Sequence, residues 1–355
     1  MTNRRVLLAA PALAVSIVLG AAAPAAACGG LIGPNGAVNL LTTTTLAGYH
    51  AGVEHYVTSF EFAGGGGAFG SIIPLPGVPT SVVRGGDWTL QRLERETEPQ
   101  ELALAFAGAE DSASSPRSAE VILEVTIDAL DITVLKGGGD EVGVWAAEHG
   151  FRLPPDAPEV LDFYAERSPI FLAASFDAKA AADRGQQLGD GTPVHVTIPT
   201  DNPWVPLRIL GLGKTAEEPV NADVYVLTDT RPSFLPAPRE TLPLLHDAAA
   251  TPGLLADLRS DKGMEWVPES AWLSKVRVAG PAGELTHDLA IDATGKGKPS
   301  RVAAGLARVS AAAPTGADAG SDSPPAWLIA VVVGVVAAAI VVAGPLARRL
   351  PTNAQ

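Results

Sequence analysis

The chain has 355 residues and a formal net charge of −14, from 39 acidic and 25 basic side chains. A surface with this excess of negative charge repels phosphate backbones, so the composition disfavours nucleic acid as a partner. The single cysteine, Cys28, excludes an intramolecular disulfide, and stability must therefore come from packing.

The N-terminus has the order of a secretory signal. Arg4 and Arg5 precede an apolar run over residues 6–20, and small residues follow up to Ala27. This order predicts a signal peptide over residues 1–27 that is removed on export. A permanent N-terminal membrane helix is disfavoured because the run is short and Pro11 interrupts it. The paired arginines leave both the general and the twin-arginine export routes open.

The predicted processing site lies between Ala27 and Cys28. Small residues before the cysteine would allow Cys28 to be the lipidated first residue of a lipoprotein. Position 25 is Ala, where lipoprotein signals usually carry Leu, and an unmodified residue near the mature N-terminus is the simpler interpretation. Both fates of Cys28 stay open.

Residues 28–235 are predicted to form one extracytoplasmic domain that begins with β-strands. The runs Leu40–Tyr49 and Val53–Phe62 read as a hairpin turned at residues 50–52. The glycine run 64–67 is expected to make a backbone turn. Asp87 is expected to cap a short helix that ends at Glu96.

The second half of this domain continues with strands and two short helices. A helix is expected from Asp140 to Gly150, and another from Asp156 to Arg167. Without regular βαβ alternation, the pattern predicts an α+β fold of mostly antiparallel sheet with a few short helices, plus one C-terminal transmembrane helix. The strands are expected at Val121–Ile127, Ile132–Leu135, Ile170–Phe176, Val194–Ile198, Leu207–Leu212 and Val224–Leu227.

A C-terminal extension is predicted over residues 236–292. It contains one helix, Pro252–Ser260, and a hairpin, Leu273–Ile291, turned at residues 281–283. Residues 293–325 are rich in Gly, Ala, Ser and Pro and are expected to form a flexible linker.

Residues 326–346 form an uncharged apolar run whose length suits a helix across a bilayer. Arg348 and Arg349 follow it, which favours a cytoplasmic tail over residues 347–355. The sequence thus predicts a single-pass protein of the cell membrane, with its large domain outside and membrane lipid as a partner of the C-terminal helix.

Several segments resemble a known bacterial family. Cys28-Gly29-Gly30, the glycine- and proline-rich stretch over residues 52–80, GGDWTLQRL over 85–93, and the runs over 153–164 and 198–209 are similar to domain of unknown function 2330, in an actinobacterial-like form. The resemblance covers roughly residues 28–235. It implies an exported envelope protein, often with a C-terminal membrane helix, and supplies no catalytic residue.

No motif in the chain predicts catalysis or a cofactor. Gly213-Lys214-Thr215 ends like a phosphate-binding loop, but Arg208 stands where that loop needs glycine. The serine-hydrolase elbow and the zinc-peptidase motif are both missing from the sequence. Five tryptophans that could form a carbohydrate platform are more simply core residues: Trp88, Trp145, Trp204, Trp266 and Trp272.

Two side-chain groups are candidates for metal or acid–base sites. His50 and His55 flank the predicted hairpin turn, with Glu54 beside them, but zinc needs three or four converging ligands. Glu159, Asp162 and Glu166 follow one face of a predicted helix, for which a solvated surface is the default. We therefore predict no metal site and no cofactor.

The leading functional prediction is a non-enzymatic envelope module that binds an unknown envelope ligand or protein. One alternative is an exported hydrolase or cation-dependent enzyme that uses the acidic helix face with His50 and His55. It requires these groups to converge in a pocket. A second alternative is a subunit of a membrane complex.

Overall fold

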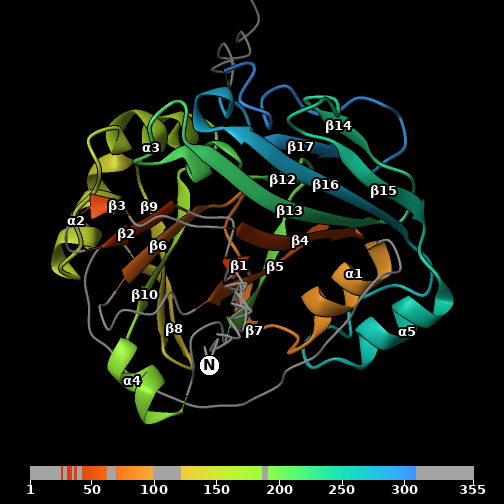
Figure 1. The fold of residues 1–355 in the computed structure, drawn as a ribbon, viewed down its shortest axis with the longest axis horizontal. Coiled ribbons are helices and arrows are strands. Elements are labelled where there is room, and N and C mark those ends of the chain that lie inside the picture. Colours follow the sequence, from red (N-terminus) through yellow and green to blue (C-terminus); the bar gives the residue numbers. More distant parts are fainter. Residues whose placement is uncertain are drawn as a thin grey trace, which may run out of the picture. The chain divides into compact units, whose positions relative to one another are not determined.

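A computed structural model describes residues 25–26, 30–33, 36–37, 42–61, 69–98, 121–185 and 191–308. They build two large β-sheets and one small sheet within one unit that extends to Val309 (Figure 1). The predicted signal peptide, apart from 25–26, and the processing residues Ala27 and Cys28 lie outside the described residues, as do residues 309–325 of the predicted linker and the whole apolar run.

The largest sheet, sheet A, contains strands from both ends of the chain. They are β1 (Ala25–Ala26), β4 (Thr42–His50), β5 (Val53–Glu61), β7 (Ser81–Arg84), β11 (Gly191–Pro199), β13 (Pro219–Thr228), β15 (Leu244–Ala249) and β16 (Trp272–Pro281). The order is β15-β16-β13-β4-β5-β11-β7, with β1 beside β4. Strand β4 is parallel to β13 and to β1, and the other pairs are antiparallel.

Sheet B is entirely antiparallel, in the order β3-β2-β6-β10-β9-β8. Its strands are β2 (Gly30–Gly33), β3 (Gly36–Ala37), β6 (Phe69–Pro74), β8 (Val121–Ile127), β9 (Leu130–Lys136) and β10 (Ile170–Phe176). Sheet C is small and joins β12 (Trp204–Val205), β14 (Ser233–Leu235) and β17 (Leu289–Asp292).

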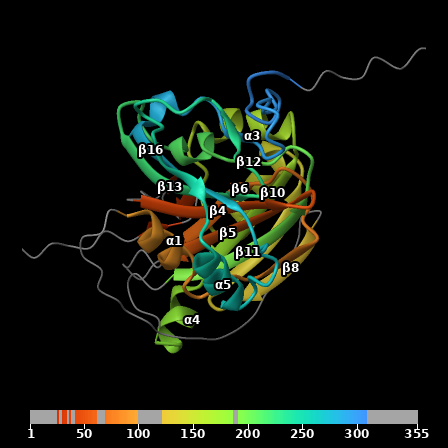
Figure 2. The ribbon, with the colours of Figure 1, turned by 90° about the vertical axis from the view of Figure 1, so that its right-hand side faces the viewer.

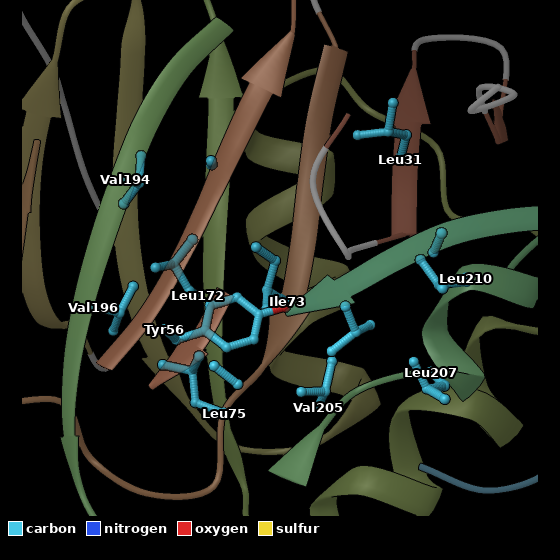
Figure 3. Packing of buried hydrophobic residues seen from close by; sticks show 14 of the residues in the cluster. Leu31, Tyr56, Ile73, Leu75, Leu172, Val194, Val196, Val205, Leu207 and Leu210 are labelled. Carbon is cyan, nitrogen blue, oxygen red and sulfur yellow. The ribbon is translucent and has the colours of Figure 1, made fainter. Parts of the chain in front are cut away.

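The main core lies between the inner faces of sheets A and B. Successive strand residues point to opposite faces of a sheet, so Tyr56 enters this core while Val57 points outward. Figure 3 shows Tyr56 beside Ile73 and Leu172, which come from sheet B. Apolar side chains therefore lie on both faces of sheet A. Each face must be shielded from water by another layer of the structure.

Helices cover the outer faces of both large sheets. On sheet A these are α1 (Thr89–Thr97) and α5 (Pro252–Ser260), which lie side by side in Figures 1 and 2. On sheet B they are α2 (Gly139–Glu148) and α3 (Ala157–Ala165). The short helix α4 (Ala178–Asp183) follows β10, and two 3-10 turns complete the regular elements: η1 (Arg208–Gly211) and η2 (Ala282–Glu284).

The predicted β4–β5 hairpin is confirmed. Ala51 and Gly52 form its two-residue turn with φ of 51° and 81°, the left-handed conformation that a tight hairpin turn requires at both positions. The predicted helix over residues 252–260 is confirmed as α5.

Two helix starts differ from the prediction, and in both cases a carboxylate accepts from an N–H group just before the helix. Asp87 does not cap α1; the Asp261 carboxylate, 174 residues away, accepts from the N–H of Asp87 instead. Helix α2 begins at Gly139 rather than at a cap on Asp140, and the Glu141 carboxylate accepts from the Gly138 N–H at 2.7 Å.

Two predicted β elements are wrong. The run Leu207–Leu212 contains the 3-10 turn η1 instead of a strand, because the buried Asp288 carboxylate accepts from the N–H groups of Leu207 and Arg208. Residues 273–291 do not form a hairpin: β16 pairs with β13 and β15, and β17 belongs to sheet C.

The predicted fold class, which included a C-terminal transmembrane helix, is corrected. The described ranges form β-rich, mostly antiparallel and partly mixed sheets with few helices, and none of their helices has the length and apolarity to cross a membrane. The apolar run 326–346 lies outside these ranges.

Candidate functional site

The candidate site is a pocket of about 340 Å³ at the C-terminal end of α3. Helix α3 turns Val160, Leu161 and Tyr164 into the core beneath it. Phe163 and Arg167 are four residues apart and therefore fall on one flank of the helix end. The pocket is lined by Phe163, Glu166, Arg167, Arg208, Thr286 and residues 305–308.

Arg167 lies inside a cage of three aromatic rings. Its guanidinium carbon is 4.3 Å from the ring centre of Phe163, 4.8 Å from that of Tyr164 and 4.5 Å from that of Trp204. Cations are attracted to the faces of such rings, and the attraction grows when water is excluded. Only 5% of the Arg167 side chain is exposed, so the cage holds a desolvated positive charge.

The counter-charge of Arg167 is Asp288, whose side chain is fully buried. One oxygen of Asp288 accepts from the Tyr164 hydroxyl at 2.9 Å and from the N–H of Leu207 at 2.7 Å and of Arg208 at 2.9 Å. Its other oxygen accepts from the Arg167 guanidinium. A buried carboxylate with this many donors fixes α3, η1 and the segment before β17 to one another.

Burial alters the electrostatics of the cage. Desolvation lowers the pKa of Arg167 to about 10, with a further lowering from Arg208 and an opposing effect from Tyr164. Arg167 therefore still carries its charge at neutral pH. The same burial raises the pKa of the Tyr164 phenol, which stays protonated and donates to Asp288.

Two nitrogens of Arg167 remain unmatched. Nε and Nη1 are buried and have no hydrogen-bond partner among the described residues. Most buried polar groups are bonded, so these two donors are an exception, and they belong to a residue that lines the pocket.

Arg208 adds a second cation over the same aromatic ring. Its guanidinium carbon is 4.3 Å from the Phe163 ring centre, and it pairs with Glu159, whose side chain is 79% exposed. A third arginine, Arg308, lies 3.5 Å from Glu166, and both of these side chains are exposed. Exposed pairs contribute little free energy, so a bound anion can compete for both arginines.

Gly305 shapes the pocket wall. Its φ of +72° favours glycine, and a Cβ there would lie 2.2 Å from the Phe163 ring and 2.4 Å from Nη1 of Arg167. A side chain at position 305 would clash with both groups, so glycine lets this segment lie directly against the cage.

The acidic face of α3 has two of its three carboxylates paired with arginines. Glu159 and Glu166 pair with arginines, and Oδ1 of Asp162 lies 3.4 Å from where a Cβ at Gly139 would be. Throughout the described ranges, no group of three or more His, Cys, Asp or Glu side chains is placed to hold a metal ion.

The two histidines of the hairpin have different partners. His50 pairs with Asp229 at 2.7 Å at the surface, whereas His55 contacts His195 at 2.9 Å on the covered face of sheet A. The acid–base alternative required one pocket for these groups and the acidic helix face. The structure does not bring them together.

The tryptophans do not form one platform. Trp145 and Trp204 are buried in the core on the outer side of sheet B, Trp266 packs in the core over sheet A, and Trp88 is 38% exposed at the start of α1. Trp272 bonds Asp247 at 2.6 Å. No local motif indicates the pocket residues, although Phe163 and Arg167 have the i, i+4 spacing of one helix face.

The family model described as an uncharacterized protein conserved in bacteria (DUF2330) matches residues 22–239. The chain belongs to this family. Phe163, Arg167 and Arg208 lie inside the family match, whereas Asp288 and residues 305–308 lie beyond it. The pocket thus combines the family region with the segment that follows it.

No protein with a curated description matches the sequence. Solved structures of the baculovirus P35 protein are similar at a distance. A mutated form after caspase cleavage is 8% identical, covering 70% of this chain and 99% of that one with a TM-score of 0.37. The caspase-8 complex is 9% identical over 70% and 95%, and P35 alone 10% over 70% and 96%, both with a TM-score of 0.37. A likeness this distant carries no functional inference.

Proposed function

We propose that this member of the family is a non-enzymatic binding module of the bacterial envelope, and that its pocket takes a small ligand with a carboxylate or phosphate group. The observation that carries the proposal is the pair of unmatched buried donors on Arg167, in a pocket that two further arginines line.

The positive charge of the three arginines favours an anionic ligand. Arginine presents donors in a planar fork that suits the oxygens of carboxylates and phosphates. Arg208 and Arg308 can turn toward such a group because their present partners, Glu159 and Glu166, are exposed. The carboxylate and the phosphate share this chemistry, and the experiment below separates them.

Size and surface limit the ligand further. A volume of about 340 Å³ is near the lower end of the range of roughly 300–1,000 Å³ for small-molecule sites. The Phe163 ring and Leu306 supply apolar contact beside the arginines. We therefore expect a compact anion with a flat or apolar portion.

Binding without catalysis is supported by what lines the pocket. Its carboxylate, Glu166, is engaged with Arg308, and its hydroxyl, Thr286, bonds Nδ1 of His287 at 2.7 Å. Thr286 and His287 have the spacing of a hydroxyl nucleophile and its base, but among the described residues no third side chain hydrogen-bonds the His287 ring, as a catalytic triad requires.

The location of the domain is part of the proposal. The signal-like N-terminus supports a position outside the cytoplasm. Protease added to intact spheroplasts should degrade the domain while a cytoplasmic marker survives. Survival of the domain until lysis would contradict this location.

Ligand binding is tested by calorimetric titration of the full-length chain with benzoate, phenyl phosphate and benzamide. Benzoate or phenyl phosphate should bind, and benzamide, a neutral analogue of benzoate of similar shape, should not. Whichever anion binds more tightly identifies the preferred source of the shared chemistry.

The variant Arg208→Gln/Arg308→Gln should weaken anion binding by about tenfold or more, since each charge-assisted hydrogen bond contributes ~1.5–3 kcal/mol. Arg95→Gln, on exposed α1 surface, removes a positive charge elsewhere and should leave the affinity unchanged. Equal affinity for benzamide, or unchanged affinity in the double variant, would overturn the proposal.

A further inference from the structure

Residues 300–308, which we call the strap, form one wall of the arginine pocket. They make turns and bends, with no helix or strand among them. Residues 305–308 line the pocket, and its other lining residues come from the end of α3, from η1 and from the segment before β17. The strap is therefore part of the site, although it is separated from α3 by more than half of the domain sequence.

The strap is attached to the domain by small contacts. Ala303 and Ala304 are buried in the core cluster beneath α3, and the Ala304 carbonyl accepts from the Asp288 N–H at 3.1 Å. The N–H groups of Leu306 and Ala307 donate within the strap, to the carbonyl of its own Arg301. Segments that bury little apolar surface open locally at lower free energy than the core does. The strap can thus lift while the sheets stay folded.

The strap is joined directly to the arginine cage. The backbone N–H of Asp288 donates to Ala304 of the strap, while the Asp288 carboxylate accepts from Arg167. Gly305 lies against Nη1 of Arg167, so close that a Cβ would be 2.4 Å from this nitrogen. The same residue, Asp288, therefore positions both the strap and the buried guanidinium. Lifting of the strap removes one side of the cage.

Charge decides how firmly the strap is seated. Arg308 of the strap lines the pocket together with Arg167 and Arg208, and like charges repel one another. The opposing attraction is weak, because Arg308 lies 3.5 Å from Glu166 and both of these side chains are exposed. An anion between Arg308 and Arg208 would replace the repulsion by charge-assisted hydrogen bonds to both.

We propose that the strap closes the arginine pocket over a bound anion, with Arg308 as the residue that couples closure to binding. The anion bridges Arg308 of the strap to Arg208 of η1, and the strap must lift for the anion to leave. Glu166 competes with the anion for Arg308 and thereby favours release. This inference rests on the proposed function, because it concerns the same site.

Linkage sets the size of the expected effect. When the strap lifts, the pocket loses Arg308 and the wall over the cage, so the anion binds the closed state. The ligand then lowers the open fraction of the strap by the factor 1 + [L]/Kd. At a concentration of ~9 Kd, amide exchange through this opening should slow by roughly tenfold.

The test is hydrogen exchange of the full-length chain, read by mass spectrometry, with phenyl phosphate or benzoate at ~9 times the Kd that calorimetry gives. Exchange in residues 300–308 should slow by roughly tenfold, and benzamide should have no effect. The short helix α4, which lies away from α3 in Figures 1 and 2, serves as the internal control and should exchange at an unchanged rate.

Two variants separate closure from binding. Arg308→Gln keeps Arg167 and Arg208 and should still bind the anion, with lower affinity. At matched occupancy its strap should slow by less than about threefold, because the anion is then held by the domain alone. Arg301→Gln is the matched control: it removes the same charge from an exposed position of the same strap that does not line the pocket, and it should keep the tenfold slowing.

The outcomes distinguish this inference from the proposed function. Anion binding with unchanged exchange in the strap, equal slowing in α4, or full slowing in Arg308→Gln at matched occupancy would overturn the closure and leave the binding module standing. Calorimetry that shows no binding of either anion would overturn the proposed function and this inference with it.

Discussion

Glu54 is a fully buried carboxyl group whose titration should govern much of the pH dependence of stability. Its side chain points from β5 into the interior, where one oxygen accepts from the Trp204 N–H at 3.3 Å. The other oxygen has no partner among the described residues. Desolvation raises the pKa of Glu54 from 4.5 to about 8, and the hydrogen bond from Trp204 opposes this only partly.

The sign of the effect follows from the raised pKa. The folded chain keeps the Glu54 proton up to about pH 8, whereas the unfolded chain releases it near pH 4.5. The stabilisation is complete below pH 4.5 and is lost as pH rises toward 8, with a slope of about 1.4 kcal/mol per pH unit. The full loss corresponds to roughly 5 kcal/mol, of which about 3 kcal/mol falls between pH 4 and pH 7.

Glu54→Gln has nearly the same shape and does not titrate, so it isolates this effect. We expect urea denaturation of the full-length chain from pH 4 to 9 to show the variant gaining on the parent by about 3 kcal/mol between pH 4 and pH 7. The difference should level off above pH 8.

A matched control removes an acid that is exposed. Glu217→Gln should differ from the parent by a nearly constant amount across the same range. If the difference curve for Glu54→Gln were as flat as that of Glu217→Gln, the interior around Glu54 would be hydrated and the burial argument would be refuted.

Three further substitutions test contacts that hold the fold together. Asp288→Asn leaves the charge of Arg167 buried without its partner and should cost about 3–5 kcal/mol in urea denaturation; a cost below ~1 kcal/mol would contradict the cage. Asp261→Ala removes the acceptor of the Asp87 and Trp88 N–H groups just before α1 and should cost about 2 kcal/mol, measured by thermal unfolding; a cost below ~0.5 kcal/mol would contradict this role. Gly48→Ala would place a Cβ 2.1 Å from the Trp266 ring and should push that ring outward, shifting its fluorescence emission to the red and costing about 1–3 kcal/mol; an unchanged spectrum would disprove the close approach.

The local elements were predictable where their signals are contained in the local sequence. The β4–β5 hairpin follows from two alternating runs around Ala51-Gly52, and α5 from Thr251, which accepts from the Leu254 N–H at 3.2 Å, with Pro252 behind it. The type of an element was predicted wrongly where a residue far away in the sequence determines it. The apolar run around Ile209 reads as a strand, but the Asp288 carboxylate draws its N–H groups into a 3-10 turn.

Long-range contacts were beyond local patterns. Arg167 meets Asp288 across 121 residues and His55 meets His195 across 140, and sequence spacing contains no information on such pairs. The acidic residues of α3 looked like candidate ligands for cations because the arginines opposite them could not be foreseen. One such partner, Arg208, comes from η1.

The residues that line the pocket come from both before and after residue 239 in the sequence, where the family match ends. A nascent chain that has reached only this point holds Arg167 without its carboxylate and lacks β15 and β16 at the rim of sheet A. The domain can complete its fold only after about seventy more residues have emerged from the ribosome or translocase. Fragments that end at the family boundary should therefore aggregate instead of folding independently.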